Sequence, residues 1–180
     1  MKTINDATSG AIVLVDASVN LSGTAAQLDA AFAGTVTTHT GTVTISDAPS
    51  VAQLKAINAA TTGAITLTTP TGALSGSVAD LLLAFAGSVT THTGTVEITD
   101  ANTTDITATD ITTIDGTNTG TITVTNTIDL NGSGSEVATA IAAIDTNTGN
   151  VTANITGTDY TAAQLKTIND ATSGAIVLVD

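Results

Sequence analysis

Short runs in which apolar and polar residues alternate recur along the chain, and each run predicts a β-strand. In residues 64–68, Ile65 and Leu67 alternate with Thr66 and Thr68, which is the period of a strand with one buried face. Related short runs occupy residues 11–15, 42–46, 95–99, 121–125 and 175–179.

An Ala-rich stretch with apolar residues at helical spacing precedes the runs. Ala162, Leu165 and Ile168 fall on one face, and Gly174 follows as a stop signal, so this stretch predicts a helix of about ten residues. The diverged stretch 106–115 is rich in β-branched residues, but its place in the repeat predicts a helix there too. Short return segments close the unit: VNLSG (19–23), GALSG (72–76) and IDLNG (128–132).

The units are internal repeats. FAGTVTTHTGTVTI (32–45) nearly equals FAGSVTTHTGTVEI (85–98), and AQLKAINAATTGAITL (52–67) nearly equals AQLKTINDATSGAIVL (163–178). The segments 2–16 and 166–180 are identical. Counting uses the residue before each key Leu or Ile: Gln27, Gln53, Asp80, Asp110, Ala140 and Gln164. The sequence therefore predicts one superrepeat over positions 1–164, followed by the start of the next over 165–180, as in a window from a longer array.

Neither the short helix nor the short strand can bury its apolar face without neighbours, which is the physical reason for repetition. We therefore expect an α/β solenoid of about six and a half stacked helix-turn-strand repeats of 24–30 residues with a parallel sheet. All of residues 1–180 would form one solenoid domain.

Charge narrows the range of partners. Three Lys, no Arg and sixteen acidic residues give a net charge of −13, which repels nucleic acid phosphates and anionic membranes. No apolar run approaches a membrane span, so we expect no membrane insertion. The N-terminal residues do not resemble a signal peptide, and the absence of Cys excludes disulfides and thiol chemistry without fixing the compartment.

His39 and His92 occupy the same place in TTHTGTV, two repeats apart. Two strand spacings would separate them by about 10 Å, too far for one shared zinc ion. We expect both to be surface turn residues and not metal ligands.

Acidic residues follow the strands at Asp16, Asp47 and Asp100, and the segment from Asp145 to Asn150 has the alternating oxygen pattern of a calcium loop. It lacks the closing bidentate Glu, and Asp and Asn also favour turns for local reasons. Turn formation is the expected role, with calcium binding as the alternative and no other cofactor expected.

Outward Thr positions include Thr42, Thr44, Thr66, Thr68, Thr121, Thr123 and Thr125. A flat Thr-x-Thr grid is one way in which ice-binding solenoids present a surface, but Val13, Val15, Glu97 and Asn154 interrupt the columns. An exposed structural face explains the Thr residues equally well.

No nucleophile motif or phosphate loop is present, and neither His has an evident catalytic partner. We expect no enzyme activity and assign no catalytic, cofactor-binding or metal-binding residue.

The unit TAAQLKTINDATSGAIVLVD (161–180) resembles the repeats of giant cell-surface and secreted proteins of marine bacteria and cyanobacteria, in composition and repeat style over the whole chain. The near-perfect copies also fit a designed or consensus-derived repeat. The resemblance implies a structural or adhesive role outside the cell, as a rigid spacer or fibre. The expected partners are neighbouring repeats of a longer chain and end-to-end self-association; the alternative is a calcium-dependent adhesin or ice-binding module.

Overall fold

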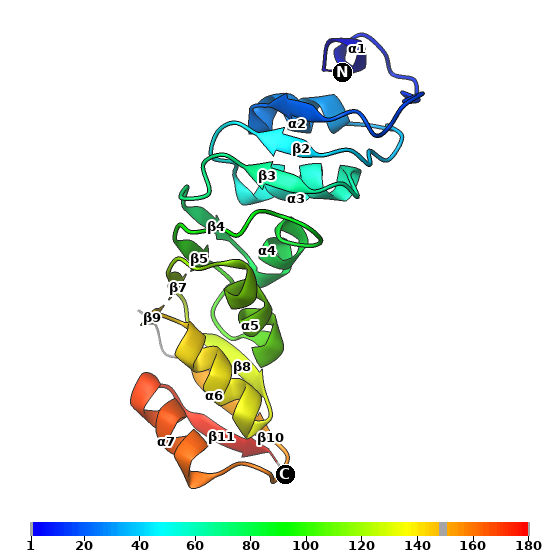
Figure 1. Ribbon diagram of the computed structural model, residues 1–180. Helices are drawn as coiled ribbons and strands as arrows, with labels where there is room; N and C mark the ends of the chain where they lie inside the picture. Colours follow the sequence, from blue (N-terminus) through cyan, green and yellow to red (C-terminus); the bar gives the residue numbers. More distant parts are fainter. Residues whose placement is uncertain (1, 148–150, 180) are drawn as a thin grey trace. The chain divides into compact units, whose positions relative to one another are not determined.

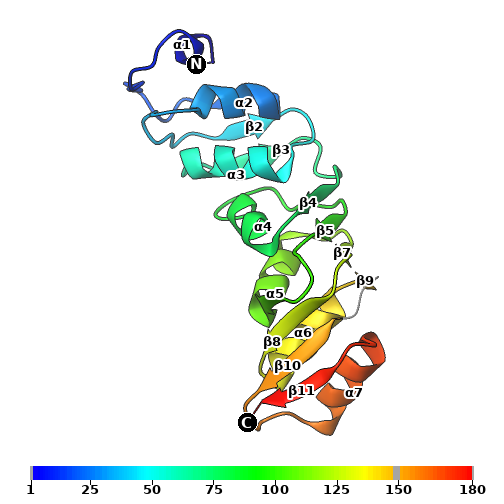
Figure 2. The same cartoon turned by 180° about the vertical axis from the view of Figure 1, so that it is seen from behind.

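The computed structural model describes residues 2–147 and 151–179, which form a mixed α/β structure (Figures 1 and 2). Seven helices and eleven short strands succeed one another in these residues. The expected α/β class and parallel pairing are therefore confirmed. Two compact units divide the chain: Met1–Leu74 with Ala79–Gly94, and Ser75–Val78 with Thr95–Asp180.

The first unit holds α1 (Lys2–Asp6), β1 (Leu21–Gly23), α2 (Ala25–Phe32), β2 (Val43–Ile45), α3 (Val51–Ala60) and β3 (Ile65–Leu67). The chain changes units within β4 (Leu74–Gly76) and α4 (Val78–Ala84). The second unit holds β5 (Val96–Ile98), β6 (Thr104–Thr107), α5 (Ala108–Thr117), β7 (Ile122–Val124), β8 (Ile128–Gly132), α6 (Gly134–Ala143), β9 (Thr146–Asn147), β10 (Thr152–Thr156), α7 (Ala162–Ala171) and β11 (Ile176–Val179).

The Gln residues from which the repeats were counted lie in the first turn of helices. Gln27, Gln53 and Gln164 are each the third residue of their helix, and each forms a capping box with the Ser or Thr that precedes the helix. The Ser or Thr side chain accepts from the Gln backbone N–H, and the Gln side chain accepts from the backbone N–H of the cap. The anchors therefore have a physical role that the sequence count did not use.

One anchor is wrong by a helical turn. In α6 the capping box joins Ser133 and Glu136, so the true equivalent of the Gln anchors is Glu136 and not Ala140. Counting from Glu136 makes the steps from Asp110 and to Gln164 nearly equal, whereas counting from Ala140 makes them unequal. Ala140 is instead a fully buried residue of the helix face.

The strands form three small parallel sheets, of order β1-β2-β3, β4-β5-β7-β9 and β11-β10-β8-β6, and not one continuous sheet. Paired residues come from strands one repeat apart, as in Leu21 with Val43 and Val96 with Ile122. The predicted return segments are themselves strands, because β1, β4 and β8 lie within them.

In the first sheet, the step between paired strands is shorter along the sequence than the step between helices. Leu21, Val43 and Ile65 occupy one row of their sheet, whereas α2 starts at Ala25 and α3 at Val51. The two layers therefore shift in phase, so that β1 directly precedes α2 while β3 follows α3.

The strand alternation is as predicted, because β2 and β3 bury their first and last residues. The predicted kind of helix face is present in α3, where Val51, Leu54 and Ile57 are buried. In α7, for which the face was predicted, only Ile168 is buried, while Leu165 is partly exposed and Ala162 is exposed. In the diverged stretch 106–115, β6 ends at Thr107 and α5 covers the remainder. The predicted strand at 11–15 is wrong: Ile12 makes one isolated parallel bridge, to Val36.

Candidate functional site

The polar residues singled out by the sequence lie mainly where one repeat contacts the next. His39 is buried, with 1% of its surface exposed, so the expected surface turn residue is wrong. Its Nε2 lies 2.8 Å from the carbonyl of Val19, and its Nδ1 lies 3.1 Å from the hydroxyl of Thr61. Its ring packs against Phe32, with centroids 5.7 Å apart. The imidazole thus bridges two chain segments, one before it and one after it in the sequence.

His92 repeats this arrangement. It is 2% exposed, its Nε2 lies 2.6 Å from the carbonyl of Gly72, and its ring packs against Phe85 at 5.9 Å. Gly72 and Phe85 are the repeat equivalents of the His39 partners Val19 and Phe32. Near-identical segments therefore occupy equivalent settings, which is what a repeat architecture requires.

Two of the acidic residues after strands also bind across repeats. The Asp47 carboxylate accepts a 2.7 Å hydrogen bond from the N–H of Ala25, the first residue of α2. Asp100 accepts one of 2.8 Å from the N–H of Val78, the first residue of α4. Each carboxylate supplies an acceptor and a negative charge at a helix N-terminus. Asp16 behaves differently, because it accepts from the hydroxyl and the N–H of Ser18, which lowers its pKa.

The expected calcium loop falls partly outside the described residues, since 148–150 are not among them. Within it, Asp145 Oδ2 accepts a 2.8 Å hydrogen bond from the N–H of Ile122, which again ties it to the preceding repeat. Over residues 2–147 and 151–179, no three His, Cys, Asp or Glu residues cluster as metal ligands would. Calcium binding stays a prediction.

The Thr positions are partly or fully exposed, as the alternation requires. Thr44 pairs in register with Thr66, and Ser22 precedes Thr44 in the same row. In another sheet Glu97 pairs with Thr123, so the row there holds a charge. The rows are short and mixed, and ice binding stays a prediction.

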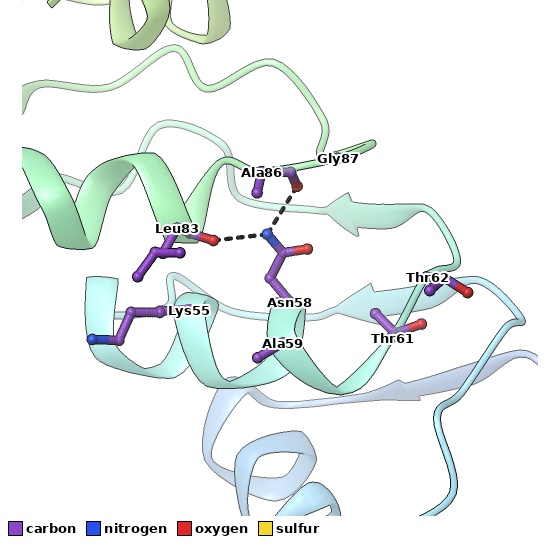
Figure 3. A pocket seen from close by; sticks show the side chains of 8 residues that line it. All are labelled: Lys55, Asn58, Ala59, Thr61, Thr62, Leu83, Ala86 and Gly87. Carbon is purple, nitrogen blue, oxygen red and sulfur yellow. Dashed lines mark hydrogen bonds between the residues drawn. The ribbon is translucent and has the colours of Figure 1, made fainter. Parts of the chain in front are cut away.

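Asn58 is a contact residue that sequence reasoning missed. Figure 3 shows its side chain between α3 and the end of α4, where Nδ2 donates to the carbonyls of Leu83 and Ala86, both at 2.8 Å. Asn5 makes the same contact with the carbonyl of Ala30 at 2.7 Å. The sequence does contain a signal for this contact, because Asn5 and Asn58 both end the motif Lys-x-Ile-Asn, which recurs in each copy of the repeat.

A groove of about 540 Å³ lies beside Asn58, lined by Lys55, Ala59, Leu83 and Gly87 among others (Figure 3). Lys55 closes one side through a 2.5 Å ion pair with Asp80 of the next helix. Both side chains are more than a third exposed, so the pair contributes little stability. Among the described residues that line the groove, Lys55 is the one charged side chain, and Thr61 and Thr62 add hydroxyl groups.

None of the helices formed by residues 2–147 and 151–179 is long and apolar enough to cross a membrane. Comparison of the chain with family models, with curated proteins and with solved structures finds no match.

Proposed function

We propose that the chain is a structural segment of a long extracellular or cell-surface protein, in which stacked α/β solenoid repeats act as a rigid spacer or fibre. The repeat style, the Thr-rich strand faces and the acidic surface support the location. No catalytic role is included in this proposal.

The observation that carries the proposal is the burial of equivalent residues. Leu67 and Leu178 end the near-identical segments 52–67 and 163–178; Leu67 is 4% exposed and Leu178 is 45% exposed. Leu67 is followed in the first unit by Val89 and Thr90, whose backbone pairs with Ile65. Leu178 has no following repeat within the sequence. A following repeat therefore supplies most of the shield that this Leu needs.

Close backbone packing between repeats gives a second support. A Cβ placed on Gly63 would meet the carbonyl oxygen of Gly41 at 1.9 Å, and one on Gly174 would meet that of Val151 at 2.2 Å. Glycine therefore recurs at this position because the preceding repeat lies against it.

Small-angle X-ray scattering tests the proposal. A globule of this length has a radius of gyration of about 16 Å. A solenoid gives a clearly larger value at infinite dilution, together with a rod-like distance distribution. A radius at the globular value would overturn the spacer function.

A further inference from the structure

The groove beside α3 lies at one of two equivalent joints between repeats. At the first joint, Asn5 of α1 donates to the carbonyl of Ala30 in α2. At the second joint, Asn58 of α3 donates to the carbonyl of Leu83 in α4, the equivalent position of the next copy. The same contact holds both joints, so the side chains around it are compared position by position.

Two substitutions make the second joint more apolar than the first. The position four residues after the motif lysine is Asp6 in the first copy and Ala59 in the internal copy. The position that accepts from the asparagine is Ala30 at the first joint and Leu83 at the second. Leu83 is 55% exposed, so it adds apolar surface that the fold itself leaves open to the groove.

The same changes give the motif lysine a different partner. In the other two copies of the motif, the lysine pairs with the aspartate four residues further along its own helix. Lys55 has Ala59 at that position, and its Nζ lies instead 2.5 Å from Oδ1 of Asp80 in the next repeat. An ammonium group carries three donor hydrogens, and among the described residues Asp80 alone accepts from this one. Lys55 therefore keeps donors for a second acceptor at the edge of the groove.

Asn58 supplies an acceptor along the same groove. Its Nδ2 is engaged by the carbonyls of Leu83 and Ala86. Its Oδ1 accepts no hydrogen bond from any residue that the structure describes, and Figure 3 shows this oxygen turned away from the carbonyl of Leu83. The groove thus offers a cation, a neutral acceptor and an apolar wall.

These groups match the carboxyl end of an apolar peptide. Lys55 is the one charged residue that lines the groove, which favours an anionic group, and the Oδ1 of Asn58 suits a backbone N–H. The two residues are three positions apart, about 4.5 Å along the helix axis. An extended peptide advances about 3.3 Å per residue, so its last two residues reach both groups. The volume of about 540 Å³ lies within the range of small-ligand sites.

We propose that this groove binds the C-terminal end of an apolar peptide chain. The free carboxylate lies on Lys55, a backbone N–H donates to Asn58, and the apolar side chains contact Leu83, Ala59 and Ala86. This role goes beyond the spacer function and does not depend on it, because every residue of the groove belongs to the first compact unit.

Titration with the peptide acetyl-Leu-Ala-Leu, followed by NMR chemical shifts, tests the proposal. We expect saturable binding, with shifts at the backbone amides of Asn58, Leu83 and Gly87. The C-terminal amide of the same peptide lacks the charge and binds roughly fivefold more weakly. Octanoate keeps a carboxylate and an apolar tail but has no N–H, so it also binds more weakly. Octanoate that binds as tightly as the peptide would overturn a peptide as the occupant.

Substitutions on α3 and α4 locate the site. Ala59→Asp restores the residue of the other copies and places a carboxylate in the groove, so it abolishes binding. Ala52→Asp adds the same charge at an exposed position of α3 that does not line the groove, and it keeps wild-type binding. Leu83→Ala installs the residue of the first joint and weakens binding roughly fivefold. Thermal melts of each variant establish that it is folded.

The absence of shifts at the highest soluble peptide concentration overturns the proposal. Equal affinity in the wild type and Ala59→Asp, or an equal loss in Ala52→Asp and Ala59→Asp, overturns it too. Scattering decides separately on the spacer function, so the failure of one proposal is distinct from the failure of the other.

Discussion

The imidazole Nδ1 of His39 lies 3.1 Å from the hydroxyl oxygen of Thr61, although the two residues come from different repeats. The Thr61 hydroxyl also donates to the carbonyl of His39 at 3.1 Å. Both the side chain and the backbone of His39 therefore contact the Thr61 hydroxyl. Both residues are buried. This pair joins the end of α3 to the preceding repeat through polar groups that water does not reach.

His39→Ala therefore lowers the free energy of unfolding by about 2–4 kcal/mol, because it leaves the Val19 carbonyl unpaired and a cavity beside Phe32. Urea denaturation measures the change. Thr38→Ala, at the exposed neighbouring position, is the control and has little effect. Equal unfolding curves for the two variants would contradict the bridging role, and His92→Ala is expected to match His39→Ala.

Two glycines have opposite expected effects when replaced by alanine. Gly63→Ala forces a Cβ into the backbone of Gly41, so we expect a loss of about 3 kcal/mol or more, comparable with other severe core changes. Gly116 lies in α5, and apart from its chain neighbours and the backbone of its own helix no described heavy atom lies within 4 Å of its Cβ position, so Gly116→Ala stabilises by about 0.5–1 kcal/mol. Thermal melting of both variants checks the signs; a tolerated Gly63→Ala would contradict the close packing of repeats.

Asp47 caps a helix of the preceding repeat and not its own. Asp47→Ala leaves the N–H of Ala25 without its acceptor and costs about 1 kcal/mol. Asp47→Asn keeps an oxygen acceptor and recovers most of that loss. Denaturation midpoints of the two variants provide the measurement, and identical losses would show that charge alone, not the hydrogen bond, matters at this helix end.

Comparison of the internal repeats of the sequence predicted much of the local structure. The near-copy of segment 32–45 at 85–98 correctly placed His39 and His92 in equivalent settings, and the Gln anchors coincide with helix starts. The anchor at Ala140 failed because α6 uses Glu136 for its capping box, and Glu136 precedes Val137, whereas the count took the residue before a Leu or Ile.

The burial of His39 could not be predicted from its own neighbours. Its flanking residues Thr38 and Thr40 are exposed, and the sequence TTHTG is typical of a surface turn. The partners that bury it, Val19, Phe32 and Thr61, come from three other segments. The division into three sheets was missed for a related reason, since strand register depends on which repeats meet and not on the strand sequence.

Glu136 makes the start of α6 sensitive to acid. Its carboxylate accepts a 2.8 Å hydrogen bond from the backbone N–H of Ser133, and this bond, with the Ser133 hydroxyl, lowers the pKa of Glu136 below its usual value. A carboxylate whose folded pKa is lowered contributes stability above its unfolded pKa and loses it as pH falls through the folded pKa. We therefore expect part of the stability to disappear below about pH 4.

Glu136→Gln places at this position the residue that α2, α3 and α7 already use. The amide still accepts the hydrogen bond but does not titrate, so the variant is slightly less stable than wild type at neutral pH and loses less stability on acidification. Urea midpoints of both proteins, followed from neutral pH down into the acid range, give the difference, which isolates Glu136 from the other carboxylates. Parallel pH profiles for the two proteins would show that the capping carboxylate of α6 does not contribute to stability through its charge.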